Sequence, residues 1–185
     1  MNYYKLGNIK STILILFIFC STGLYSCKSS KKHKVKIKTK SSVKSSRKDL
    51  NVEGTNSNKI EKALSTARSY TGTKYKFGGN TRSGIDCSGL VCAAFRSVDI
   101  MMPRTSAEQS LKGRKVDLDE LQEGDLLFFT DKKGRNKVTH VGIVTQVKGK
   151  EDVKFIHSST HLGVIEDNLY AEYYIKLFVK AMRVF

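Results

Sequence analysis

The sequence predicts an α+β domain in which helices come first and a small antiparallel sheet follows. Between about residue 58 and residue 110, apolar residues recur at the three- and four-residue spacing of amphipathic helices. From about Leu121 onward, short apolar or alternating runs are divided by turns rich in Gly and Lys. Helices that precede the strands, instead of alternating with them, favour a segregated α+β architecture. The 185 residues, 39% of them hydrophobic, are enough for one such core.

The first residues are typical of an export signal, which we place at residues 1–26. Lys5 and Lys10 precede an apolar run from Ile13 to Phe19. That run is far shorter than the roughly 20 residues needed to span a bilayer. A basic start followed by a short apolar segment therefore predicts a cleaved signal peptide.

The end of this segment, GLYSC, resembles the cleavage box of bacterial lipoproteins. The resemblance implies lipidation of Cys27 and membrane attachment through that lipid. Lys28 follows the cysteine in place of the Asp that is associated with inner-membrane retention. We therefore expect a cell-envelope protein that is anchored in the outer membrane and faces the periplasm. An ordinary signal peptide with a soluble product is the alternative.

Residues 27–57 are predicted to form a flexible, cationic tether, because Lys and Ser dominate and no Phe, Tyr or Trp is present. Most of the formal charge of +16 lies near here: residues 28–59 carry +9, and residues 60–185 carry +5. We expect no nucleic-acid partner, because the tether lacks aromatic side chains on which bases could stack. Two roles of the tether are possible: it binds anionic wall polymers or lipid head groups, or it is only a solvated spacer.

Three helices are predicted at the start of the domain, which we place at residues 58–185. Asn58 and Glu61 form a capping-box pattern before the first helix, and Thr105 and Glu108 do so before the third. The second helix begins near Cys87. The apolar stripes are Ile60, Ala63, Leu64 and Ala67 in the first helix and Leu90, Val91, Ala94, Phe95 and Val98 in the second. Strands are predicted within residues 124–130, 139–147, 152–159 and 175–185.

The stretch SGIDCSGLV places Cys87 where a loop becomes a helix. The positive end of the helix dipole favours a thiolate, and backbone N–H groups there can receive an oxyanion. Asp86 can cap the helix, and Gly89 leaves its first turn uncrowded. The competing interpretation is a small buried hydrophobe. Cys92 should point to another face of the helix, so a disulfide between the two cysteines is not expected.

Two histidines on predicted strands can supply the base that a cysteine nucleophile needs and the group that orients this base. His140 begins HVGIV, and His157 lies 17 residues later in FIHSS. Val153 and Phe155 share the face of His157, which makes that face the inward one. A hairpin would bring the imidazoles together, so that one ring accepts the thiol proton while the other fixes its tautomer. His161 follows a turn and is expected in solvent.

In this order and spacing, these motifs resemble the NlpC/P60 cysteine peptidases of bacterial cell walls. Three further segments fit: YKFGG with Phe77 where Trp is frequent, EGDLLFF with Glu123 where Pro is usual, and AMRVF. The resemblance covers about residues 60–185. It implies a papain-like α+β core with N-terminal helices packed on a small antiparallel sheet.

The resemblance also implies an activity: a cofactor-free, metal-free peptidoglycan endopeptidase that hydrolyses stem-peptide amide bonds through an acyl-enzyme. The bond is either the γ-D-glutamyl bond to the diamino acid or the D-amino cross-link between stems. The matched positions are Cys87 as nucleophile, His140 as general base, His157 as its orienting partner, Tyr75 as an oxyanion contact, and Asp86 and Ser88 as substrate-binding residues.

Two alternatives come from other functional classes. The first is a catalytically inactive peptidoglycan-binding module of the same fold. The second is a metal site made from Cys87, Cys92, His140 and His157, although the cysteines lack the Cys-x₂₋₄-Cys spacing of structural zinc. Arg82 and Arg104 could face the carboxylates of stem peptides or be ordinary surface cations. We expect a monomer.

Overall fold

The computed structural model describes residues 46–185, with side chains described from Gly54 onward. The predicted signal peptide, the lipidation site Cys27 and the first part of the predicted tether lie outside the described residues. Within the described range, no helix combines the length and apolarity needed to cross a bilayer.

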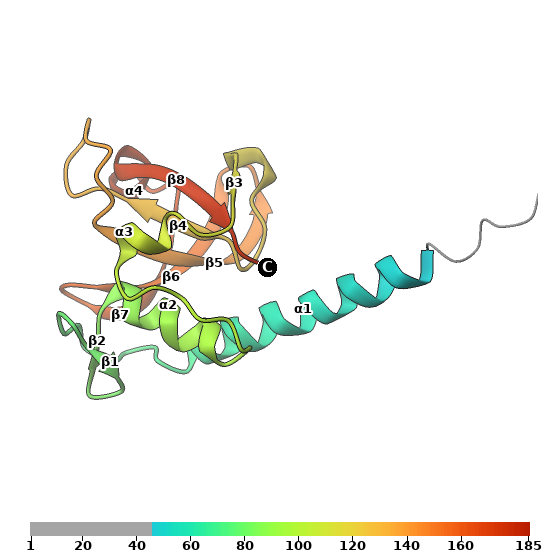
Figure 1. The fold of residues 1–185 in the computed structure, drawn as a ribbon. Coiled ribbons are helices and arrows are strands. Elements are labelled where there is room, and N and C mark those ends of the chain that lie inside the picture. The colour runs from blue at the N-terminus through green and yellow to red at the C-terminus, as the bar shows by residue number, and fades with distance from the viewer. Residues whose placement is uncertain (1–45) are drawn as a thin grey trace, which may run out of the picture. The chain divides into compact units, whose positions relative to one another are not determined.

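The order of elements along the chain is helical first and mostly stranded afterwards (Figure 1). The helical elements are α1 (Ser46–Arg68), α2 (Cys87–Arg96), α3 (Ser106–Gln109), a 3₁₀ turn η1 (Leu118–Glu120) and α4 (Glu172–Leu177). The strands are β1 (Asn80–Thr81), β2 (Gly84–Ile85), β3 (Arg114–Val116), β4 (Leu126–Phe129), β5 (His140–Gly149), β6 (Asp152–Ser159), β7 (Gly163–Asn168) and β8 (Phe178–Arg183).

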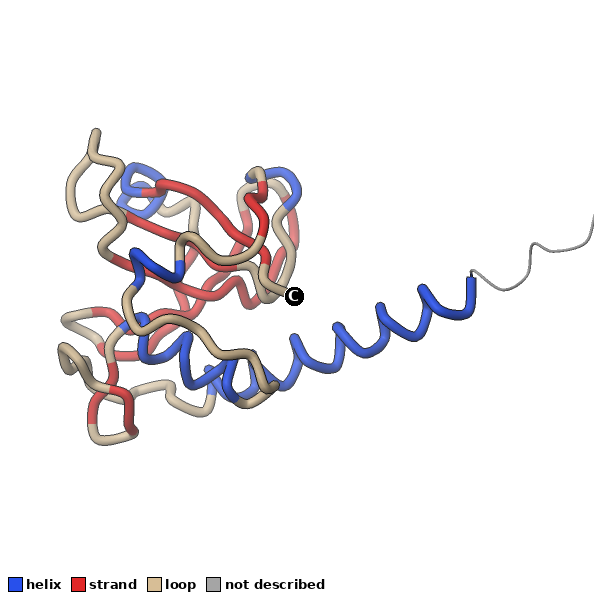
Figure 2. The backbone as a smooth tube through the Cα atoms, in the orientation of Figure 1, coloured by secondary structure: helices blue, strands red, loops and turns tan. Residues whose placement is uncertain are grey.

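Strands β3 to β8 form one antiparallel sheet in the order β3-β8-β4-β5-β6-β7. β1 and β2 form a separate small hairpin in the loop that leads to α2. The tube in Figure 2 shows α2 and the C-terminal part of α1 along one side of the sheet. The predicted fold class, helices packed on a small antiparallel sheet, is therefore confirmed.

One face of the sheet is covered by the two longer helices. The predicted stripes of the first two helices pack there against side chains from β4, β5, β6, β7 and β8, with Ile60 partly buried and the other members buried. The strand residues that meet them are Leu126, Phe128, Val141, Ile143, Ile156, Val164 and Met182. Because α2 lies on this face, its first residue, Cys87, is held against the sheet near the start of β5.

The opposite face of the sheet carries a second apolar cluster, which includes Phe129, Val144, Val153 and Phe155. Partly buried side chains of α4, Tyr174, Ile175 and Leu177 among them, pack on it. In β6, Val153, Phe155 and His157 are all at most 2% exposed, as predicted for one face of this strand, and Ile156 and Ser158 on its other face are buried as well.

The structure corrects the predicted elements in two places. α1 begins at Ser46 and passes through Asn58, so Asn58 is not a helix cap. Once a helix is nucleated by its packed part, adding residues costs little, and residues 46–57 contain no Pro that would stop it. Residues 175–177, predicted as strand, form the last turn of α4. The boundary between tether and domain at residue 57 stays a prediction.

Candidate active site

The N-terminus of α2 is capped by the carboxylate of Asp86, as the sequence predicted. Asp86 has an extended backbone, and its Oδ1 accepts a hydrogen bond of 2.7 Å from the N–H of Gly89. Its Oδ2 accepts one of 2.9 Å from the N–H of Gly78. Asp86 therefore fastens the YKFGG loop to the first turn of the helix that carries Cys87.

The close approach of this loop to α2 explains two glycines of the motifs. A Cβ atom on Gly89 would lie 2.4 Å from the carbonyl oxygen of Gly79, far inside van der Waals contact. A Cβ atom on Gly79 would lie 2.4 Å from the carbonyl oxygen of Gly84. Any larger residue at either position would push the loop away from the nucleophile.

Arg104 clamps the same carboxylate from the other side. Its guanidinium donates to both oxygens of Asp86 at 2.9 and 2.7 Å, to the hydroxyl of Ser88 at 2.8 Å and to the carbonyl of Gly79 at 3.2 Å. Burial raises the pKa of Asp86, but the hydrogen bonds from Arg104, Gly89 and Gly78 and the charge of Arg104 together lower it below its usual value.

Arg82 and Arg104, for which the sequence allowed either a substrate contact or an ordinary surface position, both form hydrogen bonds within the chain. Arg104 belongs to the Asp86 cluster, and the side chains of Asp86 and Ser88 are themselves buried, each residue only 6% exposed. Arg82 donates to the carbonyl and hydroxyl of Ser69 and lies 4.5 Å from the ring centre of Tyr70.

The thiol of Cys87 is buried, with 8% of the residue exposed. Backbone N–H groups of Val141, Ser88 and Cys87 itself approach the sulfur and favour the thiolate. Burial outweighs them and raises the pKa of Cys87 to about 11, and the charge of Asp86 raises it as well. The thiolate that the helix dipole was expected to favour is therefore not the resting form.

Tyr75 lies beside the nucleophile because it forms an isolated bridge with Ile85, two residues before Cys87. Burial first, and then the neighbouring Cys87 and Asp86 charges, raise the pKa of its hydroxyl above the usual value. A protonated phenol near the sulfur is a hydrogen-bond donor for an oxyanion.

His140 and His157 are brought together by the β5–β6 hairpin, as the sequence predicted. His140 Nε2 lies 2.9 Å from His157 Nδ1, and the rings are nearly perpendicular, at 89°. His140 directly precedes Val141, whose N–H meets the Cys87 sulfur. Burial, with a smaller contribution from His157, lowers the pKa of His140 to about 3, so its imidazole is neutral at neutral pH.

Two further polar side chains complete this group, and sequence analysis missed both. Asp167 Oδ2, on β7, lies 3.0 Å from His157 Nε2. The hydroxyl of Tyr174, on α4, donates to the same oxygen at 2.7 Å and lies 3.2 Å from His157 Nε2. The six-residue run GVIEDN after the predicted turn was the available signal for β7, and Asp167 stands within it.

His161 and Cys92 are separate from this group. His161 is exposed, as predicted. The sulfur of Cys92 lies 3.3 Å from the carbonyl oxygen of Pro103 and 3.5 Å from the amide nitrogen of Gln109. Across residues 54–185, whose side chains the structure describes, no three His, Cys, Asp or Glu side chains are arranged to hold a metal ion, and the four residues of the alternative metal site do not form such a group.

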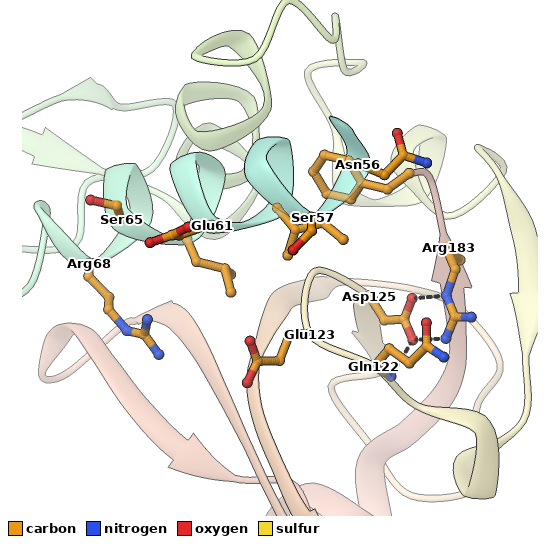
Figure 3. A pocket seen from close by; sticks show the side chains of 12 residues that line it. Asn56, Ser57, Glu61, Ser65, Arg68, Gln122, Glu123, Asp125 and Arg183 are labelled. Carbon is orange, nitrogen blue, oxygen red and sulfur yellow. Dashed lines mark hydrogen bonds and ion pairs between the residues drawn. The ribbon is translucent and has the colours of Figure 1, made fainter. Parts of the chain in front are cut away.

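A cavity of about 760 Å³ lies elsewhere, between α1 and the ends of β4 and β8 (Figure 3). Its wall includes Glu61, Arg68 and Glu123, together with the ion pair in which Arg183 binds both oxygens of Asp125 at 2.7 Å. None of Cys87, His140 and His157 lines it. Its size therefore does not make it the site of a cysteine-dependent reaction.

A cysteine at a capped helix N-terminus, packed against an antiparallel sheet that carries a histidine pair, defines the papain-like class of α+β fold. The sequence pattern of the NlpC/P60 family matches residues 72–183, which is more than half of the chain. The chain belongs to the NlpC/P60 family.

Curated relatives and solved structures agree with this assignment. The chain is 41% identical over 118 residues to the probable endopeptidase NlpC of Escherichia coli K12, covering 63% of this chain and 73% of that protein. It is 35% identical over 116 residues to murein DD-endopeptidase MepS/murein LD-carboxypeptidase of the same strain, covering 62% and 57%. An NlpC/P60 crystal structure from Bacillus cereus superposes with a TM-score of 0.62 at 32% identity, covering 68% and 40%.

Proposed function

We propose that this chain is a cysteine endopeptidase that hydrolyses amide bonds in the stem peptides of peptidoglycan. The observation that carries the proposal is the contact between the start of α2, in the helical part of the fold, and the start of β5, in the sheet. The thiol at the start of α2 meets the N–H of the residue after His140, and the ring of His140 is held by His157. Family membership and the endopeptidase names of its relatives support the same reaction.

The first step is a proton transfer from the Cys87 thiol to His140. Because His157 occupies Nε2 of His140, the other ring nitrogen, Nδ1, is the one left to accept the proton. Burial disfavours a lone thiolate and a lone imidazolium, but the transfer creates both at once, so that each charge stabilises the other. The apparent pKa values of the reaction thus belong to the pair.

The thiolate then attacks the carbonyl carbon of the stem-peptide amide. The N–H groups at the start of α2 and the hydroxyl of Tyr75 stabilise the oxyanion that forms. His140 returns its proton to the leaving amine, and an acyl-enzyme remains on Cys87. Water, deprotonated by His140, attacks this thioester, which releases the carboxylic acid and the free thiol.

Two stem-peptide bonds are candidates, the γ-D-glutamyl bond to the diamino acid and the D-amino cross-link. Asp86 and Ser88 flank the nucleophile and are our candidates for substrate-binding residues. Arg104 holds both side chains in place. The test is mass spectrometry of fragments released from purified peptidoglycan. Stems that end at D-glutamate, with a diamino-acid peptide released, indicate the first bond, and conversion of cross-linked dimers into two intact single stems indicates the second.

The same experiment separates this function from that of an inactive binding module. The proposal predicts fragment release by the native chain and none by Cys87→Ser. A chain that sediments with peptidoglycan but releases no fragment would instead support the binding module.

We further propose that the chain acts from a lipid anchor at Cys27, in the outer membrane facing the periplasm. The GLYSC box after a short apolar segment supports this placement. The variant Cys27→Ser should move the protein from the membrane pellet to the soluble fraction. A variant that stays in the pellet, with no lipid mass on the N-terminal peptide of the native protein, would refute it.

A further inference from the structure

We propose that Asp167 and Tyr174 are positioning residues that fix the tautomer of His140 through His157. The inference rests on the proposed function, because the tautomer matters only if His140 must accept the thiol proton. The four side chains form a continuous hydrogen-bonded row from β5 through β6 and β7 to α4.

The direction of each hydrogen bond follows from the end of the row. An ionised carboxylate can only accept, so Asp167 Oδ2 receives the proton of His157 Nε2 at 3.0 Å. A neutral His157 with its proton on Nε2 has a lone pair on Nδ1. The 2.9 Å contact to His140 must then be a hydrogen bond donated by His140 Nε2. Nδ1 of His140 consequently carries no proton and is free to act as the base.

These hydrogen-bond directions require a neutral His157. Burial lowers the pKa of His157 below its usual value, while the hydrogen bond and charge of Asp167 raise it less. His157 is only 2% exposed, and the rings of Phe155 and Tyr174 lie about it at 5.0 and 5.4 Å. The titratable groups that face it in the structure are His140, Asp167 and Tyr174.

The backbone places Asp167 for this task. In the β6–β7 ladder, Phe155 is opposite Asp167 and His157 is opposite Ile165. Asp167 is thus a diagonal neighbour of His157 on the same face of the sheet, within reach of a long side chain. The neighbouring Glu166 lies on the other face and pairs with Arg68 at 2.9 Å. Asp167 is therefore the only carboxylate of β7 that contacts His157.

Tyr174 secures the carboxylate. Its hydroxyl donates to Asp167 Oδ2 at 2.7 Å, which orients that oxygen toward His157. Burial, and next the hydrogen bond and charge of Asp167, raise the pKa of Tyr174 well above its usual value, so this hydroxyl remains a donor throughout the working pH range. Its neighbour Tyr173 is 68% exposed and offers a matched control.

The test uses four variants of the full chain, with turnover of a soluble muropeptide. Asp167→Ala removes the acceptor, and we expect kcat to fall about ten- to a hundredfold with KM within about twofold, by analogy with groups that hydrogen-bond to and orient metal-binding histidines. Asp167→Asn can keep an oxygen in the same place and should retain clearly more activity. In Tyr174→Phe, kcat should fall a few-fold. The control Glu166→Ala should stay near the native kcat.

A second readout separates positioning from support of the fold. Nitrogen-15 NMR of the histidine rings, recorded without substrate, reports which ring nitrogen carries the proton. In the native chain we expect His140 protonated on Nε2. In Asp167→Ala we expect a substantial fraction protonated on Nδ1, whereas Glu166→Ala and Tyr173→Phe should match the native spectrum.

The inference is overturned if Asp167→Ala and Glu166→Ala have the same kcat. It is equally overturned if Asp167→Ala loses activity while His140 keeps its native tautomer. Because the tautomer is read without substrate, a native chain that releases no peptidoglycan fragment would defeat the proposed function and leave this measurement intact.

Discussion

The two cysteines of α2 differ both in burial, with Cys87 buried and Cys92 partly buried, and in the polar groups that surround them. Cys87 begins the helix and Cys92 lies one and a half turns later. Burial raises the pKa of both thiols. Around Cys87, however, lie three backbone N–H groups, the hydroxyl of Tyr75 and the strand that begins with His140. The nearest polar partners of Cys92 are the carbonyls of Met102 and Pro103 and the amide of Gln109.

The comparison shows that a helix N-terminus alone does not create a reactive thiol in this fold. With a pKa of about 11, Cys87 would be almost entirely protonated at neutral pH. In the proposed mechanism, what distinguishes Cys87 from Cys92 is the neutral imidazole of His140, which takes the proton of Cys87. The following changes test that difference, beginning with the largest expected effect.

Removing either member of the reacting pair should abolish hydrolysis. Cys87→Ala deletes the nucleophile, and His140→Gln replaces the base with an amide that cannot take the thiol proton. We expect turnover of a soluble muropeptide to fall by at least about a thousandfold in each, with near-native folding by circular dichroism. Measurable turnover by a folded His140→Gln would show that another group accepts the proton.

Changing His157 should have a graded effect. His157→Gln retains a polar group that can hydrogen-bond to His140, whereas His157→Ala leaves His140 unsupported. We expect the Gln variant to keep clearly more activity than the Ala variant, and the exposed His161→Ala to be near native. Equal damage in folded His157→Ala and His161→Ala chains would contradict the assignment of the inward histidine.

Acid should destabilise the native chain through His140. Its pKa is about 3 when folded and about 6.5 when unfolded, so the unfolded chain binds an additional proton between these values. The contribution of His140 to the free energy of unfolding is fully present above pH 6.5 and is lost as the pH falls toward 3. The burial-lowered pKa of His157 acts in the same direction.

Urea unfolding at pH 7.5 and pH 4.5 measures this loss. We expect His140 to contribute on the order of 2 kcal/mol to the decrease in the free energy of unfolding. His140→Gln should show a smaller decrease than the native chain, and the exposed control His161→Gln should not. An identical pH dependence in native and His140→Gln chains would argue against an imidazole that the fold keeps neutral.

The smallest effect is expected from Cys92→Ala. This change removes a partly buried thiol that packs between α2 and the Pro103 segment but touches none of the reacting groups. Its kcat should remain within about twofold of native, while the free energy of unfolding falls by about 1 kcal/mol. A loss of activity comparable to that of Cys87→Ala would remove the distinction between the two cysteines.

Much of this site was predictable because it is made of local patterns. Asp86 and Cys87 lie on adjacent positions at a loop-to-helix boundary. Period-two alternation identified His157 as inward, and the turn that precedes His161 identified that residue as exposed. Each of these inferences uses residues within a few positions of one another. The helix stripes and β6 were predicted for the same reason.

The remainder depends on long-range contacts that a single sequence does not encode in a readable way. Asp167 reaches His157 only through the β6–β7 register. Tyr174 reaches it from a short helix that was not predicted and whose last residues, 175–177, were predicted as strand. Arg104 closes on Asp86 from 18 positions away. The burial that raises the pKa of Cys87 likewise comes from the packed fold and is not visible in the motif.

Alkylation of the folded chain tests the central claim, that Cys87 is made reactive by His140, most directly. The native chain and His140→Gln are treated with iodoacetamide at pH 7.5, and the labelling rates of the Cys87 and Cys92 peptides are followed by mass spectrometry. We predict that Cys87 is labelled much faster than Cys92 in the native chain and that this advantage disappears in His140→Gln. Comparable rates for the two cysteines in the native chain, or an undiminished rate for Cys87 in the variant, would contradict the claim.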